Sequence, residues 1–167
     1  VTNNESLFKR FIERARKSSK GVSVAGMDNI MISFGKCCNP VPGDPITGIV
    51  TRGRGIVVHT NSCNNLLRLM QEPERIIDVA WDVDKENRFL AGLYILCERR
   101  SRFLADLSEA VSSSDGIITS ANMNADISLV NCTVSIEVYD LDHLNRIIAK
   151  IKKVAGVISV SRWSEPK

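Results

Sequence analysis

Four side chains of the kind that bind soft metal ions lie within one short stretch of the chain. Cys37 and Cys38 are adjacent, and His59 stands four residues before Cys63. The last two fall at a predicted strand-to-helix junction, where both side chains can converge. A closed set of thiolates and imidazole suits a structural Zn²⁺ ion. Adjacent cysteines cannot easily aim both sulfurs at one ion without local strain, so a set of only three of the four ligands is an alternative.

The same residues have two interpretations without a metal ion. The cysteines can pack as small hydrophobic side chains, with His59 hydrogen-bonded beside them. Alternatively they form a thiol redox sensor, because a helix N-terminus would favour the thiolate of Cys63. The residue types alone leave all three chemistries open.

A second group of residues is basic and glycine-rich. Arg52 and Arg54 alternate with glycines, and Lys36 lies beside the cysteine pair. Arginines at a hairpin tip can reach phosphates and stack on unpaired bases, although exposed arginines without a ligand are also common there. The charge distribution favours contact of the N-terminal part with nucleic acid or another anionic surface, and an ordinary solvated helix face is the alternative. Residues 1–60 carry nine Lys and Arg against four Asp and Glu, whereas residues 89–167 carry nine of each.

The composition narrows the class of protein. The chain has 167 residues, of which 44% are hydrophobic and 25% charged, as in soluble globular proteins. No apolar run approaches the ~20 residues of a membrane helix, and the N-terminus lacks the apolar region of a signal peptide. Five cysteines, an odd number, argue against a secreted disulfide scaffold. The cysteine content and the lack of long apolar runs predict a cytoplasmic protein without membrane contact. Since the chain does not begin with Met, we also expect it to be a segment of a longer protein.

Short elements in the first half of the chain must position these side chains. Residues 5–18 have the apolar spacing of an amphipathic helix, and we assign residues 1–20 to a linker. Residues 21–82 are predicted to form a small α+β domain with many turns. Its short helix follows a cap at Asn61 or Ser62. Its predicted strands are residues 30–33, 46–51, 56–59 and 76–81.

Residues 88–167 are predicted to form a second domain after a polar boundary at residues 82–87. The element order is strand–helix–strand–strand–helix–strand, the ferredoxin-like arrangement of an antiparallel sheet with two helices on one face. Cys97 and Cys132 fall on inward strand positions and are expected in the core. His143 is expected to be exposed. The predicted elements are residues 89–97, 102–113, 117–125, 132–139, 141–154 and 157–162.

Two sequence strings carry a family resemblance. GKCCNPVPGD over residues 35–44 and GIVTRGRGIVVH over residues 48–59, followed by Cys63, closely resemble the zinc-finger-like domain of the RelA/SpoT family. That domain is also called the conserved-cysteine or ribosome-intersubunit domain. Residues 73–81 resemble the end of the same domain, and the βαββαβ unit resembles the family's C-terminal ACT domain.

The resemblance implies a regulatory region of a stringent-response (p)ppGpp synthetase/hydrolase, or GTP pyrophosphokinase. The family's hydrolase and synthetase domains lie upstream, and none of their motifs fits into this chain, so we expect no catalytic residues here. The resemblance further implies binding to the ribosome when uncharged tRNA occupies the A site, and otherwise restraint of the upstream catalytic domains. Lys36, Arg52, Arg54 and His59 then fall in the stretch that would face ribosomal RNA and tRNA.

The first loop of the ACT-like domain departs from the family pattern. The pattern D-R-x-G-L-L-A-D reads here RRSRFLAD over residues 99–106, so arginine replaces both the acidic residue and the glycine. ACT domains elsewhere often bind amino acids at this loop, commonly across a dimer. Arg102 adds bulk and charge where glycine would let a ligand approach closely. Arg99, Arg100 and Arg102 fit RNA contact better, and the alternative is an amino-acid-sensing or homodimerising module that acts through intramolecular contacts.

Overall fold

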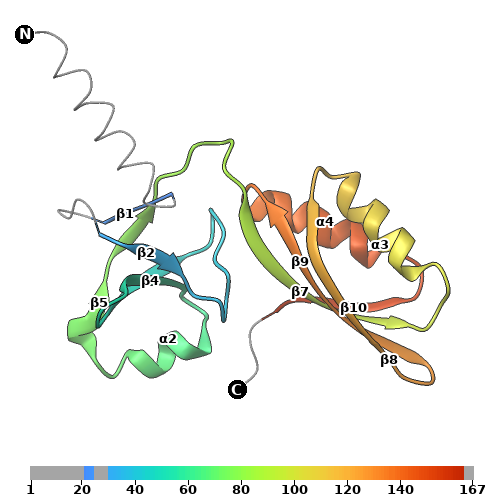
Figure 1. Cartoon of the computed structure of the whole chain (residues 1–167), viewed down its shortest axis with the longest axis horizontal. Helices are drawn as coiled ribbons and strands as arrows, with labels where there is room; N and C mark the ends of the chain where they lie inside the picture. Colours follow the sequence, from blue (N-terminus) through green and yellow to red (C-terminus); the bar gives the residue numbers. More distant parts are fainter. Residues whose placement is uncertain (1–20, 25–29, 164–167) are drawn as a thin grey trace, which may run out of the picture. The chain divides into compact units, whose positions relative to one another are not determined.

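The computed structural model describes residues 21–24 and 30–163 (Figure 1). They form two compact units. The first comprises the described residues up to Gly35 together with Pro45–Asn87, and the second comprises Lys36–Asp44 and the described residues from Arg88 onward. The amphipathic helix predicted over residues 5–18 lies outside the described part of the chain. Among the described residues, no helix is both long and apolar enough to cross a bilayer.

A four-stranded sheet in the order β2-β4-β3-β5 organises the first unit. Strands β3 (Ile46–Thr51) and β4 (Gly55–Thr60) are rich in β-branched residues and form the predicted antiparallel hairpin. Strand β2 (Ile32–Phe34) runs parallel to β4, and the short β5 (Ile76–Ile77) pairs with β3. The hairpin is thus the centre of the sheet and fixes the positions of the residues at its two ends.

The edge of this unit differs from the prediction. The single strand predicted over residues 76–81 is divided at Asp78, because its two halves pair with different partners. Its second half, β6 (Val79–Trp81), pairs with β1 (Val22–Val24), a strand that was not predicted. The pair contributes Val22, Val24 and partly Trp81 to the apolar core of the unit.

Helix α2 (Asn64–Leu69) has its N-cap one residue after Ser62 and two residues after Asn61, the two predicted caps. Cys63 occupies its N-cap position with extended backbone and without a side-chain cap bond. The predicted cap at Asn61 or Ser62 was therefore wrong. The Asn61 side chain instead accepts a hydrogen bond from the Thr47 hydroxyl at 2.7 Å, so it closes the open end of the hairpin.

The second unit confirms the predicted βαββαβ order. Its four strands form one antiparallel sheet in the order β10-β7-β9-β8, and both helices cover the same face of it (Figure 1). The elements are β7 (Phe89–Glu98), α3 (Phe103–Ser112), β8 (Ile117–Ala125), β9 (Leu129–Val138), α4 (Leu141–Lys152) and β10 (Val157–Arg162).

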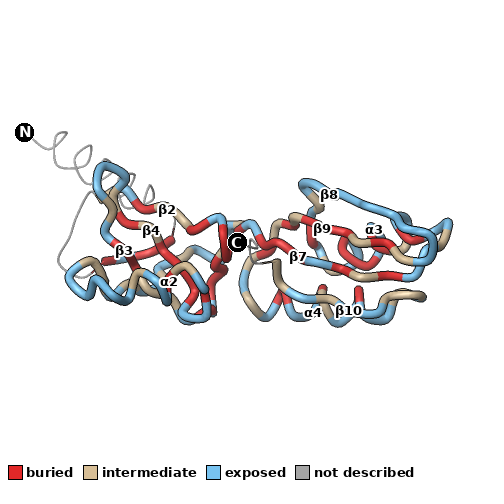
Figure 2. Tube along the Cα trace, turned by 90° about the horizontal axis from the view of Figure 1, so that it is seen from below, coloured by how far each residue is buried: buried red, intermediate tan, exposed pale blue. Residues whose placement is uncertain are grey.

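Burial along β9 follows the period of two that places alternate residues on opposite faces of a sheet. Buried and partly buried residues alternate over its whole length, and in Figure 2 β8 beside it is pale blue for most of its course. Cys97 and Cys132 are fully buried, which confirms their place in the core. On the outer side of α3, Leu104 is 51% exposed.

His143 is buried, so the prediction that it is exposed was wrong. Its Nδ1 accepts from the backbone N–H of Tyr139 at 3.1 Å, and its Nε2 donates to the carbonyl of Ser114 at 2.6 Å. The N-cap residue Asp140 accepts from the His143 backbone N–H at 2.7 Å. A polar ring is tolerated in the core because both nitrogens have partners, which the sequence pattern did not reveal.

Candidate metal centre and basic surface

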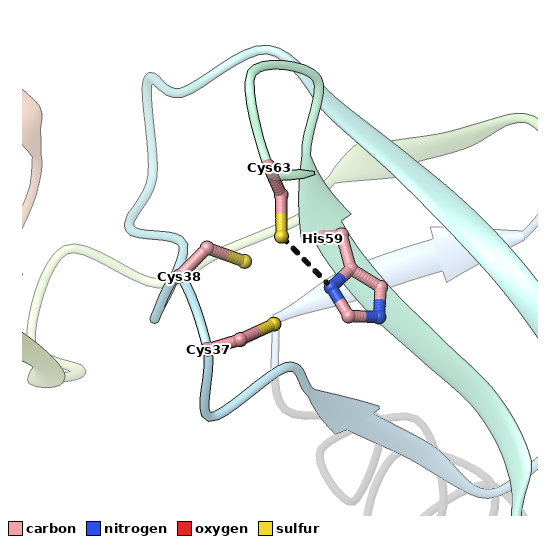
Figure 3. Close-up of side chains that lie close together, drawn as sticks. All are labelled: Cys37, Cys38, His59 and Cys63. Atoms are coloured by element: carbon pink, nitrogen blue, oxygen red, sulfur yellow. Dashed lines mark hydrogen bonds between the residues drawn. The ribbon is translucent and has the colours of Figure 1, made fainter. Parts of the chain in front are cut away.

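Cys37, Cys38, His59 and Cys63 come together in one cluster, as predicted from their types. The two adjacent cysteines lie on one loop, His59 lies near the end of β4, and Cys63 follows at the start of α2 (Figure 3). Their ligand atoms all lie within 4.8 Å of one another, and all four residues are buried. The strand end and the helix start converge here because only a short turn joins them.

The donor set fits a zinc ion. In a tetrahedral site with ordinary Zn–S and Zn–N bond lengths, a sulfur and a nitrogen ligand lie about 3.6 Å apart and two sulfurs about 3.8 Å apart. The Sγ atom of Cys63 lies 3.6 Å from Nδ1 of His59, and the widest separation in the cluster requires closure by only about 1 Å. Three thiols and one imidazole without an open position are typical of a structural site.

The adjacent cysteines both reach the cluster, which favours the four-residue set over the alternative of three ligands. Figure 3 shows both sulfurs directed towards His59 and Cys63. The backbone turns sharply after the pair, since Asn39 has a φ of 42° and its side-chain amide donates to the carbonyl of Lys36 at 3.3 Å. Asparagine tolerates the left-handed conformation better than most residues, so the loop folds back without glycine.

Burial of His59 changes the pKa of its imidazole in the direction that metal binding requires. It lowers the pKa of the imidazole below the ordinary value of histidine, because the charged form loses its hydration. The ring is therefore neutral at physiological pH, as a metal ligand must be. Burial also argues against the redox-sensor interpretation, because the Cys63 side chain is only 5% exposed and reactive sensor thiols are accessible.

Gly35 is a site residue that the sequence patterns did not single out for this role. It extends the parallel pairing of β2 with β4, donating its N–H to the carbonyl of Val58 at 2.8 Å. A methyl group at position 35 would lie 2.5 Å from Nδ1 and 2.6 Å from Cε1 of His59. The absent side chain therefore makes room for the imidazole. Its position directly before the Lys-Cys-Cys run was the available signal.

The predicted RNA-binding residues of the first half divide into exposed and buried members. Arg52 and Arg54 are exposed in the turn of the β3–β4 hairpin, and Lys36 is exposed beside the cysteine pair. His59, which was expected in both the metal set and the RNA set, is 7% exposed and faces the cysteines. A buried imidazole in this position could bind a metal ion but is not exposed to a nucleic acid.

The arginines of the β7–α3 loop are unequally available. Arg100 donates to the Asp106 carboxylate at 2.6 Å and to the carbonyl of Ala155 at 2.8 Å, so its guanidinium is engaged within the fold. The Arg102 side chain is 74% exposed, and Arg99 is exposed. Arg99 and Arg100 also line an open hollow of about 900 Å³ together with residues 127–129. The hollow is at the loop where the sequence departs from the ACT pattern.

Family models match both parts of the chain. A model described as the RelA/SpoT RIS domain matches residues 22–82, and a model described as the ACT domain matches residues 85–162. The first match contains all four residues of the cluster and the β3–β4 hairpin with Arg52 and Arg54 in its turn, which we call the arginine hairpin. The second contains the βαββαβ unit, so the prediction of an α+β chain with a Cys/His region followed by an ACT domain is confirmed.

Curated relatives come from several bacteria. A GTP pyrophosphokinase of Myxococcus xanthus is 40% identical over 93% of this chain and 20% of its own length. The bifunctional (p)ppGpp synthase/hydrolase RelA of Mycobacterium tuberculosis is 36% identical over 85% of this chain and 19% of its own length. The bifunctional (p)ppGpp synthase/hydrolase SpoT of Escherichia coli is 32% identical over 90% of this chain and 22% of its own length. The chain thus spans about one fifth of the length of the curated relatives that it matches.

A solved structure is similar to the second unit. The crystal structure of the ACT domain from GTP pyrophosphokinase of Chlorobium tepidum is 30% identical, with a TM-score of 0.42, and the match covers 46% of this chain and 99% of that one.

Proposed function

The chain belongs to the RelA/SpoT family and carries a RIS domain followed by an ACT domain, and on this premise we propose that it docks a (p)ppGpp synthetase/hydrolase on ribosomal RNA and uncharged tRNA. The proposed docking residues are Arg52 and Arg54 in the turn of the β3–β4 hairpin, with Lys36 beside the cysteine pair as a further basic residue. Through this contact the chain would control catalytic domains elsewhere in the same protein. The observation that carries the proposal is the exposure of Arg52 and Arg54 at the tip of a hairpin in a domain of this family.

The hairpin is held in one shape by several contacts, which suits it to present charges at fixed positions. Within it, the Thr51 hydroxyl donates to the carbonyl of Gly55 at 2.8 Å, and Arg75 donates from Nε to the carbonyl of Val50 at 3.1 Å. Gly55 has a φ of +74°, and a side chain there would overlap the carbonyl of Met31. Arg52 and Arg54 therefore project from a rigid support and lose little conformational freedom of the backbone on binding.

A structural zinc ion held by Cys37, Cys38, His59 and Cys63 completes the proposal. When bound, the ion would cross-link the cysteine loop to the end of β4 and contribute to folding stability. The chain's own residues supply the rest: Gly35 makes room for the imidazole, and burial keeps that ring neutral. The cluster then fixes one end of β4, whose other end begins at the arginine turn.

Neutralising the hairpin arginines is expected to weaken ribosome binding. For an Arg52→Gln, Arg54→Gln double variant, we expect affinity for ribosomes with uncharged tRNA in the A site to fall by about tenfold or more at moderate salt. The dependence of log affinity on log salt should become shallower by roughly 1 to 2, because each lost phosphate contact removes a little under one unit of slope. Fluorescence titration of the labelled chain with ribosomes, at KCl concentrations from about 50 to about 200 mM, measures the affinity and its dependence on salt.

A matched variant separates local contact from net charge. Arg146→Gln with Lys152→Gln also removes two positive charges from exposed positions, but on helix α4. The proposal predicts that this variant keeps the salt slope of the unaltered chain. Equal losses in the two double variants would mean that overall charge, and not the hairpin, drives binding.

A further inference from the structure

The loop that carries the cysteine pair is held by the last strand of the ACT unit. Lys36–Asp44 belongs to the same compact unit as residues 88–163, although it lies far from them in the sequence. Asp44, at the end of this loop, is 8% exposed, and its carboxylate accepts from Nη1 of Arg162 at 2.7 and 2.9 Å. Arg162 is the last residue of β10.

Arg162 also contacts the loop backbone next to the cysteines. Its Nη2 donates to the carbonyl of Asn39 at 2.9 Å and lies 3.5 Å from the carbonyl of Cys38. One guanidinium thus joins the two ends of the turn that follows the cysteine pair. Its planar set of donors can hold a carboxylate and a carbonyl at once, which a single ammonium group cannot do in the same geometry.

The rest of the loop has further attachments that make this geometry specific. The Asp44 carboxylate accepts from the backbone N–H of Val41 at 2.8 Å, and the carbonyl of Pro42 accepts from the N–H of Leu141 at 2.8 Å. The second bond fixes the loop to the first residue of α4. The segment after Cys38 is therefore anchored at three points within the ACT unit.

We propose that Arg162 is a positioning residue for the metal-binding cysteines, because its contacts with Asp44 and Asn39 fix the loop that presents Cys37 and Cys38. The predicted effect of Arg162 on zinc affinity rests on the metal site of the proposed function. The ACT unit thereby sets the geometry of two of the four ligands. Partners that orient metal ligands typically change metal affinity by about 10- to 100-fold when removed.

The first test measures the loop without any metal. In the reduced, metal-free chain, each cysteine is labelled with N-ethylmaleimide and quantified by peptide mass spectrometry. Arg162→Ala is expected to speed labelling of Cys37 and Cys38 by roughly tenfold or more, because local opening follows the contacts that resist it. Cys97 and Cys132 should stay protected, since they lie in the ACT core and burial raises the pKa of the Cys132 thiol to about 11.

Three further variants sharpen this test. Asp44→Asn, which weakens the same pair from the other side, should act in the same direction as Arg162→Ala. Arg162→Lys should fall between Arg162→Ala and the unaltered chain. Arg146→Ala, an exposed arginine on α4, should change nothing. Labelling of Cys37 and Cys38 within twofold of the unaltered chain in Arg162→Ala would overturn the proposal, and so would equal acceleration of all five cysteines, which would indicate general destabilisation.

The second test measures zinc affinity of the same variants by competition with a chromophoric chelator. Arg162→Ala is expected to bind Zn²⁺ about tenfold more weakly or worse. The two readouts fail separately. If the unaltered chain binds no zinc but Arg162→Ala still exposes Cys37 and Cys38, the metal proposal fails and the positioning role stands. If zinc binds equally to both chains and labelling is unchanged, Arg162 has no such role.

Discussion

A Cys63→Ser chain is expected to lose its zinc and much of the stability of the RIS domain. Removing one of four ligands from a buried cluster should lower zinc affinity by roughly 100-fold or more. At a fixed free zinc concentration, such a loss corresponds to about 2.7 kcal/mol of stabilisation. Metal content per chain by elemental mass spectrometry and urea unfolding at fixed free zinc measure the two effects. The matched control is Cys132→Ala, which removes a buried thiol outside the cluster and should keep one zinc per chain.

The pH dependence of this stability has a defined sign. Because burial lowers the pKa of His59, the unfolded chain binds a proton more readily than the folded chain. The contribution of His59 to the free energy of unfolding is fully present above the pKa of the unfolded chain, 6.5, and is lost as the pH falls through the lower pKa of the folded chain. Acid should also displace zinc, since thiolates and imidazole take up protons. A zinc content that is unchanged by Cys63→Ser would contradict the assignment of the ligands.

A Gly35→Ala chain is expected to disturb the cluster although it alters no ligand. The added methyl group would lie 2.5 Å from the His59 ring, which is closer than two such atoms approach. Overpacking of a buried site typically costs about 1–3 kcal/mol. The ring must move, and we expect zinc affinity to fall with stability. Urea unfolding with and without zinc, together with the chelator competition, measures the size of both effects.

A double-mutant cycle identifies the clash as the cause. In a His59→Ala background the imidazole is gone, so Gly35→Ala should cost much less stability in the metal-free chain. Equal costs in the two backgrounds would show that the strand backbone, and not the histidine, limits what residue 35 can be.

Local patterns sufficed to predict most elements of the ACT unit. The alternation along β9 and the apolar stripe of α4 are long signals that depend only on neighbouring residues. The strand β1 escaped prediction because three residues carry almost no periodic signal. Its existence depends on pairing with β6, from a distant part of the sequence.

The candidate site was predictable in its residue types but not in its geometry. Cys37, Cys38, His59 and Cys63 could be chosen as soft ligands from the sequence, yet their convergence depends on tertiary packing that brings the cysteine loop to the end of β4. The burial of His143 and the contact of Arg162 with Asp44 likewise depend on tertiary packing. Spacing along the chain contains no information on a partner more than one hundred residues away.

The proposed function predicts a preference among ribosomes that differ only in the A site. Cosedimentation of the zinc-loaded chain with ribosomes whose A site is empty, holds aminoacylated tRNA or holds uncharged tRNA tests this most directly. We expect retention to be greatest with uncharged tRNA and to decline steeply as salt is raised, as binding through phosphate contacts requires. No retention at low salt, or equal retention in all three states, would contradict the account.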